Sequence, residues 1–485
     1  MSRYLINDNV QLRSFKDGSY FLMKKDKYNV FPVTMKEYCI LNACDGSIDL
    51  PDDSPIIKKY ISTHCIHKSE SEEERVTIDY QDCPNRHAFY MTLEITDRCN
   101  YNCLHCFNAA GTETFKNEMP LEKVLSLLDQ AALAGVHGIL ITGGEPLLHR
   151  DFFTIYEAVY QKGMIVYELN TNGSLITPEF LDRLSAVPFK PTLKISFDGI
   201  GFHDKMRGVS GSEERTIHAI SLAIEKGFKV RINMNVNQLN SAAMLPSILM
   251  LDKLGVFTTR IIRTTEAPRW EALSNGATLS WSEYYELAFN ITREYLQEKP
   301  SMNINFWQFV NIYPGSRKYY HPFIQTSPIC TSENAYLCNT VAGNLAVTAS
   351  GTVVPCMQMS GALSVLGKHM ENIFELGIGN TLDENSEYSK ISLITQAQKK
   401  SINAICRDCP YWEYCGGGCP AISLLTSNEY CGCSKLNCIF FRDNWPERVN
   451  KLLAQHGFKS ITPLPDIDDG GYLDNVQLQN GTDLY

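Results

Sequence analysis

Three cysteines in one short segment have the types and spacing to hold an iron-sulfur cluster. Cys99, Cys103 and Cys106 form the pattern Cys-x3-Cys-x2-Cys, directly after the apolar stretch Met91–Ile95. Three thiolates can ligate three irons of a cubane, which leaves the fourth iron open to a chelating substrate. A zinc knuckle without its fourth ligand, or a set of buried cysteines, is the alternative interpretation of this spacing.

A glycine-rich turn follows the next apolar stretch, Ile139–Thr142. It consists of Gly143, Gly144 and Glu145. Paired glycines let a ligand approach the backbone, and a glutamate can accept hydrogen bonds from an ammonium group. If both apolar stretches are strands of a βα barrel, the cysteines and this turn lie at the strand ends that carry the active site.

A second and larger set of cysteines occupies the C-terminal third. Of 17 cysteines, ten lie between 330 and 438, and four of them form the pattern Cys-x2-Cys-x5-Cys-x3-Cys at 406, 409, 415 and 419. Because cytosolic thiols are kept reduced, metal ligation explains this density better than disulfides do. A zinc ribbon is the main alternative, but spacings of five and three fit it less well.

Alternating apolar strands and amphipathic helices surround the first two motifs, which is typical of βα units around a parallel sheet. We expect an α/β fold whose centre, 83–310, is a partial (β/α)6 barrel. The expected strands are 89–95, 138–142, 165–170, 192–197, 229–236 and 258–262, and the expected helices are 121–134, 152–162, 178–184, 213–226, 242–254 and 281–296.

The two ends of the chain differ from this centre. Residues 1–82 have three short alternating runs, then a capping box of Thr34 and Glu37 before a helix at 35–43 and a second helix at 55–61, which predicts a small winged-helix-like α+β domain. Residues 311–445 form the predicted cysteine-rich domain. Residues 446–485 form a C-terminal extension with a flexible tail.

The charge and the apolar content of the sequence limit the kinds of partner that we expect. The net charge is -10 and there is no basic run, which argues against nucleic acid. We find neither a signal peptide nor an apolar stretch of membrane-spanning length, so we expect a cytoplasmic protein without a membrane partner.

The cysteine loop followed by Gly-Gly-Glu resembles the radical S-adenosylmethionine (SAM) superfamily. The resemblance implies that Cys99, Cys103 and Cys106 bind a catalytic [4Fe-4S] cluster and that SAM chelates its open iron. It places the cofactor's amino group at Gly143, Gly144 and Glu145, its adenine at His105, its ribose and methionine parts at Ser196 and Asp198, and its carboxylate near Arg207. It also implies hydrogen abstraction by a 5′-deoxyadenosyl radical.

The C-terminal cysteines resemble the SPASM extension, which binds two auxiliary [4Fe-4S] clusters. This makes three clusters in total. The resemblance assigns Cys330, Cys338, Cys356 and Cys419 to the first auxiliary cluster, and Cys406, Cys409, Cys415 and Cys438 to the second. Cys431 or Cys433 could replace Cys438.

The N-terminal domain resembles the element that recognises the leader of a ribosomally made precursor peptide by strand addition. Together with the other two regions it resembles maturases that form cysteine thioethers of the sactipeptide or ranthipeptide type. The resemblance implies that a reducing donor such as flavodoxin or ferredoxin supplies the enzyme with electrons. A carbon-carbon crosslinking maturase of the streptide kind is the alternative. Sulfatase-maturing enzymes carry an Asp after the cysteine that matches Cys356, where this chain has Met357.

A non-catalytic iron-sulfur or zinc-stapled peptide-binding scaffold is the alternative from another class. Such a scaffold would have no need of a three-cysteine loop with an open iron, or of the paired glycines that follow it.

Overall fold

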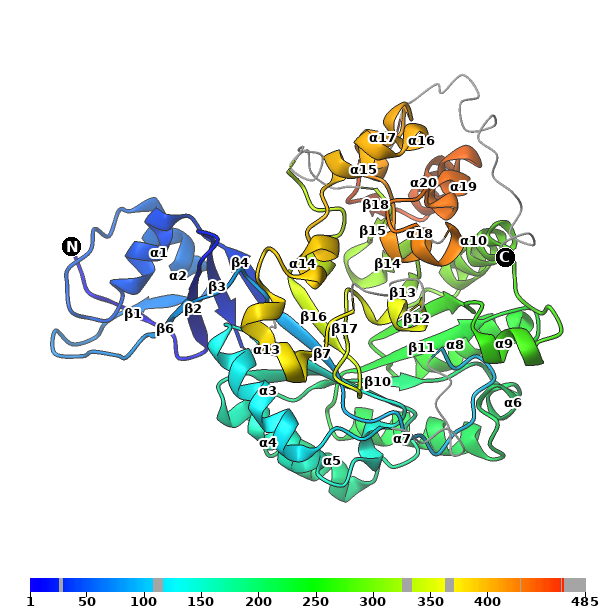
Figure 1. Cartoon of the computed structure of the whole chain (residues 1–485), viewed down its shortest axis with the longest axis horizontal. Coiled ribbons are helices and arrows are strands. Elements are labelled where there is room, and N and C mark those ends of the chain that lie inside the picture. Colours follow the sequence, from blue (N-terminus) through cyan, green and yellow to red (C-terminus); the bar gives the residue numbers. More distant parts are fainter. Residues whose placement is uncertain are drawn as a thin grey trace.

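A sheet of twelve strands runs through the middle of the computed structural model, which describes residues 1–25, 29–107, 117–324, 334–362, 370–427, 429–463 and 465 (Figure 1). Its six central strands are β7 (Tyr90–Glu94), β8 (Gly138–Thr142), β9 (Ile165–Thr171), β10 (Thr192–Ser196), β11 (Val230–Val236) and β12 (Thr258–Arg263). Neighbours in this series pair in parallel. All six expected strands are present.

Helices cover one face of these strands, as expected. They are α3 (Leu121–Leu133), α4 (Phe152–Gln161), α5 (Pro178–Leu184), α7 (Ser212–Glu225), α8 (Met244–Lys253) and α10 (Trp281–Gln297). Every second residue of a strand, such as Val230, Ile232 and Met234 on β11, joins the apolar core with these helices. The opposite face carries the polar residues of the same strands.

The sheet continues beyond the six expected strands on both sides. After β12 come β13 (Asn303–Phe306), β14 (Val310–Tyr313), β15 (Lys318–Tyr320) and β18 (Lys459–Ser460). On the other side β16 (Asn344–Val347) pairs in parallel with β7, and β17 (Val353–Val354) follows it. Segments of the cysteine-rich region and of the C-terminal extension therefore belong to the central sheet, through pairings too distant in sequence for local pattern to indicate.

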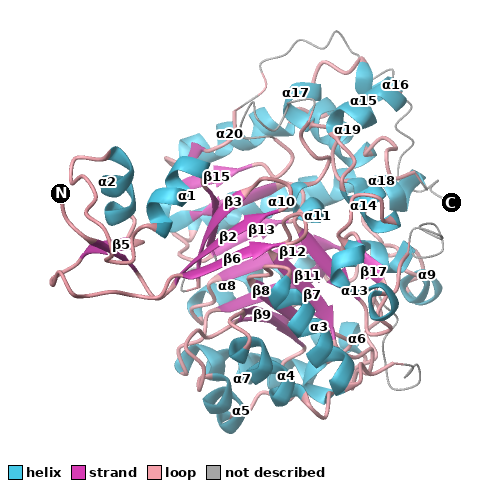
Figure 2. Cartoon of the chain, turned by 60° about the vertical axis from the view of Figure 1, so that its left-hand side comes forward, coloured by secondary structure: helices cyan, strands magenta, loops and turns pink. Residues whose placement is uncertain are grey.

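Short helices form most of the described C-terminal third, and the last of them in the sequence lie in the upper part of Figure 1. They are α11 (Asn339–Ala342), α13 (Ile373–Thr381), α14 (Glu387–Ser392), α15 (Gln396–Ile402), α16 (Ala404–Arg407), α17 (Trp412–Cys415), α18 (Pro420–Ser427), α19 (Lys435–Arg442) and α20 (Trp445–Gln455). In Figure 2 most of them lie across the sheet from α4, α5 and α7. Most of the tail that we expected to be flexible lies outside the described residues.

The N-terminal lobe projects from one end of the molecule (Figure 1). A four-stranded sheet in the order β4-β3-β2-β6 is made by β2 (Val10–Phe15), β3 (Tyr20–Lys24), β4 (Asn29–Pro32) and β6 (Asp79–Cys83). Helices α1 (Met35–Asn42) and α2 (Pro55–Ser62) were expected, and the capping box of Thr34 and Glu37 is confirmed. The pair β1 (Tyr4–Ile6) and β5 (Ile66–Lys68), together with β6, was not expected.

Two short helices on the central sheet complete the framework of the site. They are α6 (His203–Arg207) and α9 (Pro268–Leu273). Among the helices in the described part of the chain, none has the length and apolar character needed to cross a membrane.

Candidate active site

The three cysteines of the first motif lie together in the loop that follows β7. Burial raises the pKa of the Cys99 thiol to about 12, and the neighbouring thiols of Cys103 and Cys106 raise it further. A thiol with so high a pKa becomes a ligand only when a metal displaces its proton. Three thiols in one loop fit the three-point attachment of an iron-sulfur cluster.

Helix α6 holds this loop in place. The backbone N–H of Asn102 donates to the carbonyl oxygen of Arg207 at 3.2 Å, and that of Leu104 donates to Met206 at 2.9 Å. Gly208 ends α6 with φ of 68°, and a Cβ there would lie 2.6 Å from the Asn102 carbonyl oxygen. The close approach of loop and helix therefore requires glycine at this position.

A buried ion pair lies beneath the loop. The Nε of Arg207 is 2.8 Å from Oδ2 of Asp198, and its Nη1 donates to the Cys103 sulfur at 3.6 Å. Burial raises the pKa of Asp198, but the Arg207 guanidinium, the two nearby histidines and the Asn235 N–H together outweigh burial and keep that pKa below its usual value. His105 Nε2 is 3.5 Å from the same carboxylate, and burial lowers the pKa of His105 to about 4. The imidazole is therefore neutral near pH 7.

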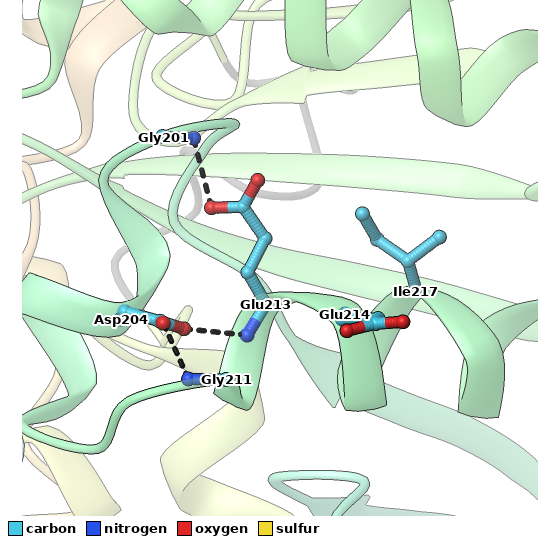
Figure 3. Close-up of a pocket in the computed structure, with 6 residues that line it drawn as sticks. All are labelled: Gly201, Asp204, Gly211, Glu213, Glu214 and Ile217. Carbon is cyan, nitrogen blue, oxygen red and sulfur yellow. Dashed lines mark hydrogen bonds between the residues drawn. The ribbon is translucent and has the colours of Figure 1, made fainter.

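Acidic residues brace α6 against α7, in the pocket drawn in Figure 3. The Asp204 carboxylate accepts from the backbone N–H of Gly211 at 2.5 Å and of Glu213 at 2.7 Å, so it caps the start of α7. The Glu213 carboxylate accepts from the Gly201 N–H at 2.8 Å. These carboxylates hold the backbone that carries Arg207.

The Gly-Gly-Glu turn packs directly under the base of the cysteine loop. A Cβ at Gly143 would lie 2.5 Å from the Thr96 carbonyl oxygen, and one at Gly144 would lie 2.3 Å from that of Arg98. The glycines are thus required by contact between two backbones, a reason that their sequence pattern did not reveal.

Glu145 is fully buried at the end of this turn. Its carboxylate accepts from the Asn172 N–H at 2.7 Å and the Thr171 hydroxyl at 2.8 Å, and it caps η1 (Pro146–Leu148). Burial raises its pKa to about 7 in spite of these bonds. The remaining expected cofactor residue, Ser196, ends β10 two positions before Asp198. The assignment of these residues to parts of the cofactor stays a prediction.

Three of the four cysteines expected at the first auxiliary cluster lie together. Burial raises the pKa of Cys356 to about 12, with further increases from Cys419 and Cys338. Cys356 follows β17, Cys338 precedes α11 and Cys419 precedes α18. Cys330 lies outside the described residues.

The second auxiliary set is gathered around α16 and α17. Burial raises the pKa of Cys415 to about 12, and the neighbouring thiols of Cys406 and Cys409 contribute to this increase. A hydrogen bond links Cys406 with Cys433, whose sulfur is 3.3 Å from that of Cys438. Cys438 as the fourth ligand stays a prediction, and the contact with Cys406 favours Cys433.

A turn of three glycines directs Cys415 and Cys419 to different sites. Gly416, Gly417 and Gly418 all have positive φ, at 57°, 89° and 73°. This left-handed backbone favours glycine. It lies between Cys415, whose pKa is raised by burial and by the neighbouring Cys406 and Cys409, and Cys419, whose pKa is raised by burial and by Cys338.

Sequence reasoning missed two residues of this region. Lys399 is fully buried, its Nζ donates to the Gly417 carbonyl oxygen, and its charge opposes the rise in pKa of the Cys406 and Cys415 thiols. Asn403 accepts from the Cys406 N–H at 3.0 Å and donates to the Cys431 carbonyl oxygen at 3.1 Å. A lysine on a short polar helix gives no signal of burial in the sequence.

Two family models match the regions just described. The radical SAM superfamily matches residues 93–238, which contain the cysteine loop, and SPASM, an iron-sulfur cluster-binding domain, matches residues 338–410. The chain therefore contains a radical SAM domain and a SPASM domain. This confirms the family predicted from the cysteine patterns, and it makes [4Fe-4S] clusters and SAM the cofactors of this radical SAM protein.

Relatives cover different shares of the chain. The AdoMet-dependent heme synthase of Methanosarcina barkeri is 32% identical over 164 residues, which are 33% of this chain and 46% of that enzyme. The chain thus spans about half or less of the first relatives that it matches. The antilisterial bacteriocin subtilosin biosynthesis protein AlbA of Bacillus subtilis is 25% identical over 354 residues, which are 70% of this chain and 69% of AlbA.

A solved structure has the same fold over most of the chain. Streptococcus suis SuiB bound to its precursor peptide SuiA matches with a TM-score of 0.64 and 16% identity, covering 89% of this chain and 99% of SuiB. At this identity the likeness concerns the fold alone.

Proposed function

We propose that this radical SAM protein is a peptide maturase that installs thioether crosslinks between cysteine sulfur and a carbon atom within a ribosomally made precursor peptide. The observation that carries the proposal is the gathering of cysteines at three separate places, because radical generation needs one cluster and an oxidative crosslink needs an electron acceptor. The relation to AlbA, named for the biosynthesis of a bacteriocin, supports a peptide substrate.

In this proposal three clusters are held by the cysteines already described. Cys99, Cys103 and Cys106 bind the catalytic cluster. The first auxiliary cluster takes Cys330, Cys338, Cys356 and Cys419, and the second takes Cys406, Cys409, Cys415 and either Cys433 or Cys438. When bound and reduced, the catalytic cluster supplies the electron that splits SAM and so provides the radical that removes hydrogen from the peptide.

The residues around the cysteine loop hold the cofactor. Arg207 and Asp198 form a neutral pair, so the Arg207 guanidinium can stay near the loop without adding net charge to the buried site. Neutral His105 can face adenine without a charge. Glu145 fixes the shape of the turn that, with Gly143 and Gly144, receives the cofactor's amino group, while Ser196 and Asp198 receive its ribose and methionine parts.

The N-terminal lobe binds the leader of the precursor. Strand β4 is an edge of its sheet, and two large apolar side chains beside this edge, Phe31 and Met35, are 43% and 62% exposed. An extended peptide added to β4 would gain backbone hydrogen bonds and cover both side chains. Phe31→Glu should weaken leader binding roughly tenfold in fluorescence anisotropy with the leader peptide encoded beside this gene, because a charge would replace apolar contact. Ile48→Glu, equally exposed in the same lobe, is the control.

Iron analysis and product analysis test the enzyme activity. Anaerobically purified protein should contain about twelve irons, and a variant with alanine at Cys99, Cys103 and Cys106 about eight. Only the wild type should form 5′-deoxyadenosine. A modified precursor that has lost two hydrogens and one alkylatable thiol per crosslink indicates a thioether, whereas retention of every thiol indicates a carbon-carbon crosslink. Stoichiometric zinc without iron would overturn the proposal.

A further inference from the structure

The sheet face opposite the helices carries polar side chains at one level of four neighbouring strands. On β11, Ile232 and Met234 enter the helix-covered core, so Asn233 faces the other side. On β13, Ile304 and Phe306 enter the same core, so Asn305 also faces away from it.

Strand register places these side chains in a row. Asn233 is directly opposite Arg260, Arg260 is opposite Asn305, and Asn305 is opposite Asn311. Residues that are opposite in a sheet project from the same face. We call Asn233, Arg260, Asn305 and Asn311 the carboxamide row. It crosses three strand spacings, about 14 Å, which is the length of roughly four residues of extended peptide.

Four polar atoms of the carboxamide row have no hydrogen-bond partner among the residues that the structure describes. The Oδ1 atoms of Asn233, Asn305 and Asn311 and the Nε of Arg260 are buried, and within the described part of the chain none has a hydrogen-bond partner. Asn311 is only 3% exposed. Buried carboxamides and guanidinium groups are normally satisfied, so four unsatisfied neighbours in register indicate a surface completed by a ligand.

The charge around the row is positive. Lys194 and Arg231 both pair with the buried Glu168, the latter at 3.2 Å. Arg260 forms no such pair with any residue that the structure describes, and its guanidinium lies 5.7 Å from the centre of the Trp307 ring. The surplus guanidinium therefore fits a carboxylate on the ligand.

The position of the row connects the cysteine sites. Ser196, two residues before Asp198, is opposite Asn233, so one end of the row starts beside the radical SAM site. Arg260 is near enough to the Cys356 thiol for the two to influence each other electrostatically. A peptide lying along the row would therefore pass between the catalytic loop and the first auxiliary site.

We propose that the carboxamide row binds the segment of the substrate peptide that is modified, with its asparagines bonding the peptide backbone and Arg260 pairing with a carboxylate of the peptide. The proposal rests on the proposed function and adds a substrate class to it. Asparagine side chains both donate and accept, which suits the alternating N–H and C=O groups of an extended chain.

Affinity selection of synthetic peptides tests this inference. Two pools of short random peptides, one with free and one with amidated C-termini, are selected on anaerobic holoprotein with SAM and no reductant, and the retained peptides are sequenced by mass spectrometry. We expect acidic residues to be enriched about 10- to 100-fold in the amidated pool on wild type, because a charge-assisted pair contributes at that level. If only peptides with a free C-terminus were enriched, the same site would be supported, with the terminal carboxylate as the partner of Arg260.

Matched variants localise the effect. Arg260→Gln should abolish the enrichment, and Arg293→Gln, which changes an exposed arginine on α10, should keep it. Asn305→Ala should lower retention of all peptides about tenfold without changing the preference. The inference would be overturned if the wild type showed no preference for acidic peptides, or if Arg260→Gln showed the same preference as the wild type. It would also be overturned if Arg260→Gln shifted only the reduction potential of an auxiliary cluster. Iron content and SAM cleavage, measured in parallel, show whether the proposed function itself has failed.

Discussion

Replacing Arg207 by glutamine tests whether the buried ion pair holds the cysteine loop. Asp198 is fully buried and the Arg207 side chain is 8% exposed. Arg207→Gln would leave Asp198 as a buried carboxylate without its partner, which costs about 3–5 kcal/mol. Because the carbonyl oxygens of Arg207 and Met206 accept from Asn102 and Leu104, we expect this cost to appear as easier opening of the loop. The two loop amides should exchange hydrogen roughly 100- to 5,000-fold faster.

Hydrogen exchange followed by mass spectrometry of the peptide that contains the loop, under anaerobic conditions, measures this opening. Arg183→Gln is the matched control, because Arg183 forms a carboxylate pair at 3.0 Å with Glu157 while both side chains are about half exposed. Such a pair contributes at most about 1 kcal/mol. Asp198→Asn combined with Arg207→Gln removes both charges and should recover much of the protection. Equal exchange in the Arg207 and Arg183 variants, or no recovery in the double variant, would refute the reasoning.

Three further outcomes follow from the geometry. Cys433→Ser should remove about four of about twelve irons, whereas Cys438→Ser and Cys431→Ser should keep them, as measured by iron analysis. The pKa of Glu37 is lowered to about 2 by hydrogen bonds from Lys59 and from the Thr34 backbone. The contribution of this carboxylate to the free energy of unfolding is therefore complete above the ordinary carboxyl pKa and is lost as pH falls towards 2. Glu37→Gln should therefore remove about 1–2 kcal/mol at pH 7 and almost nothing near pH 2, measured by thermal melting of the N-terminal lobe. Gly418→Ala should lower the melting temperature of the cysteine-rich region, because its Cβ would lie 2.6 Å from a carboxamide oxygen of α19.

The local sequence pattern was sufficient to predict the strands and helices of the central βα units. Buried strands such as Ile165–Thr171 read as apolar runs, and helix starts such as that of α1 carry their own capping residues, so each element is specified by neighbours in sequence. The cysteine loop could be recognised equally well, because its three cysteines lie within eight residues.

What could not be predicted depends on contacts between distant residues. Strand β16 pairs with β7 although about 250 residues separate them, and its four residues carry no periodic signal of their own. Lys399 and Arg260 are cations by type. Only the packed structure shows that Lys399 is buried beside thiols and that the Nε of Arg260 has no hydrogen-bond partner among the described residues. The need for Gly143 and Gly144 likewise comes from the Thr96 and Arg98 carbonyls.

The pairing of β16 with β7 constrains how this protein can be recombined with its relatives. Strand β7 leads into the cysteine loop, and β16 leads through β17 to Cys356, so two adjacent strands of one hydrogen-bonded ladder carry the cysteines that we propose for two different clusters. A chimera joined between the radical SAM and SPASM regions would have to transplant that ladder intact, since cutting it exposes the edge of β7 to other chains. The natural unit of exchange is therefore a pair of strands, and a junction placed between the two regions in the sequence would divide that pair.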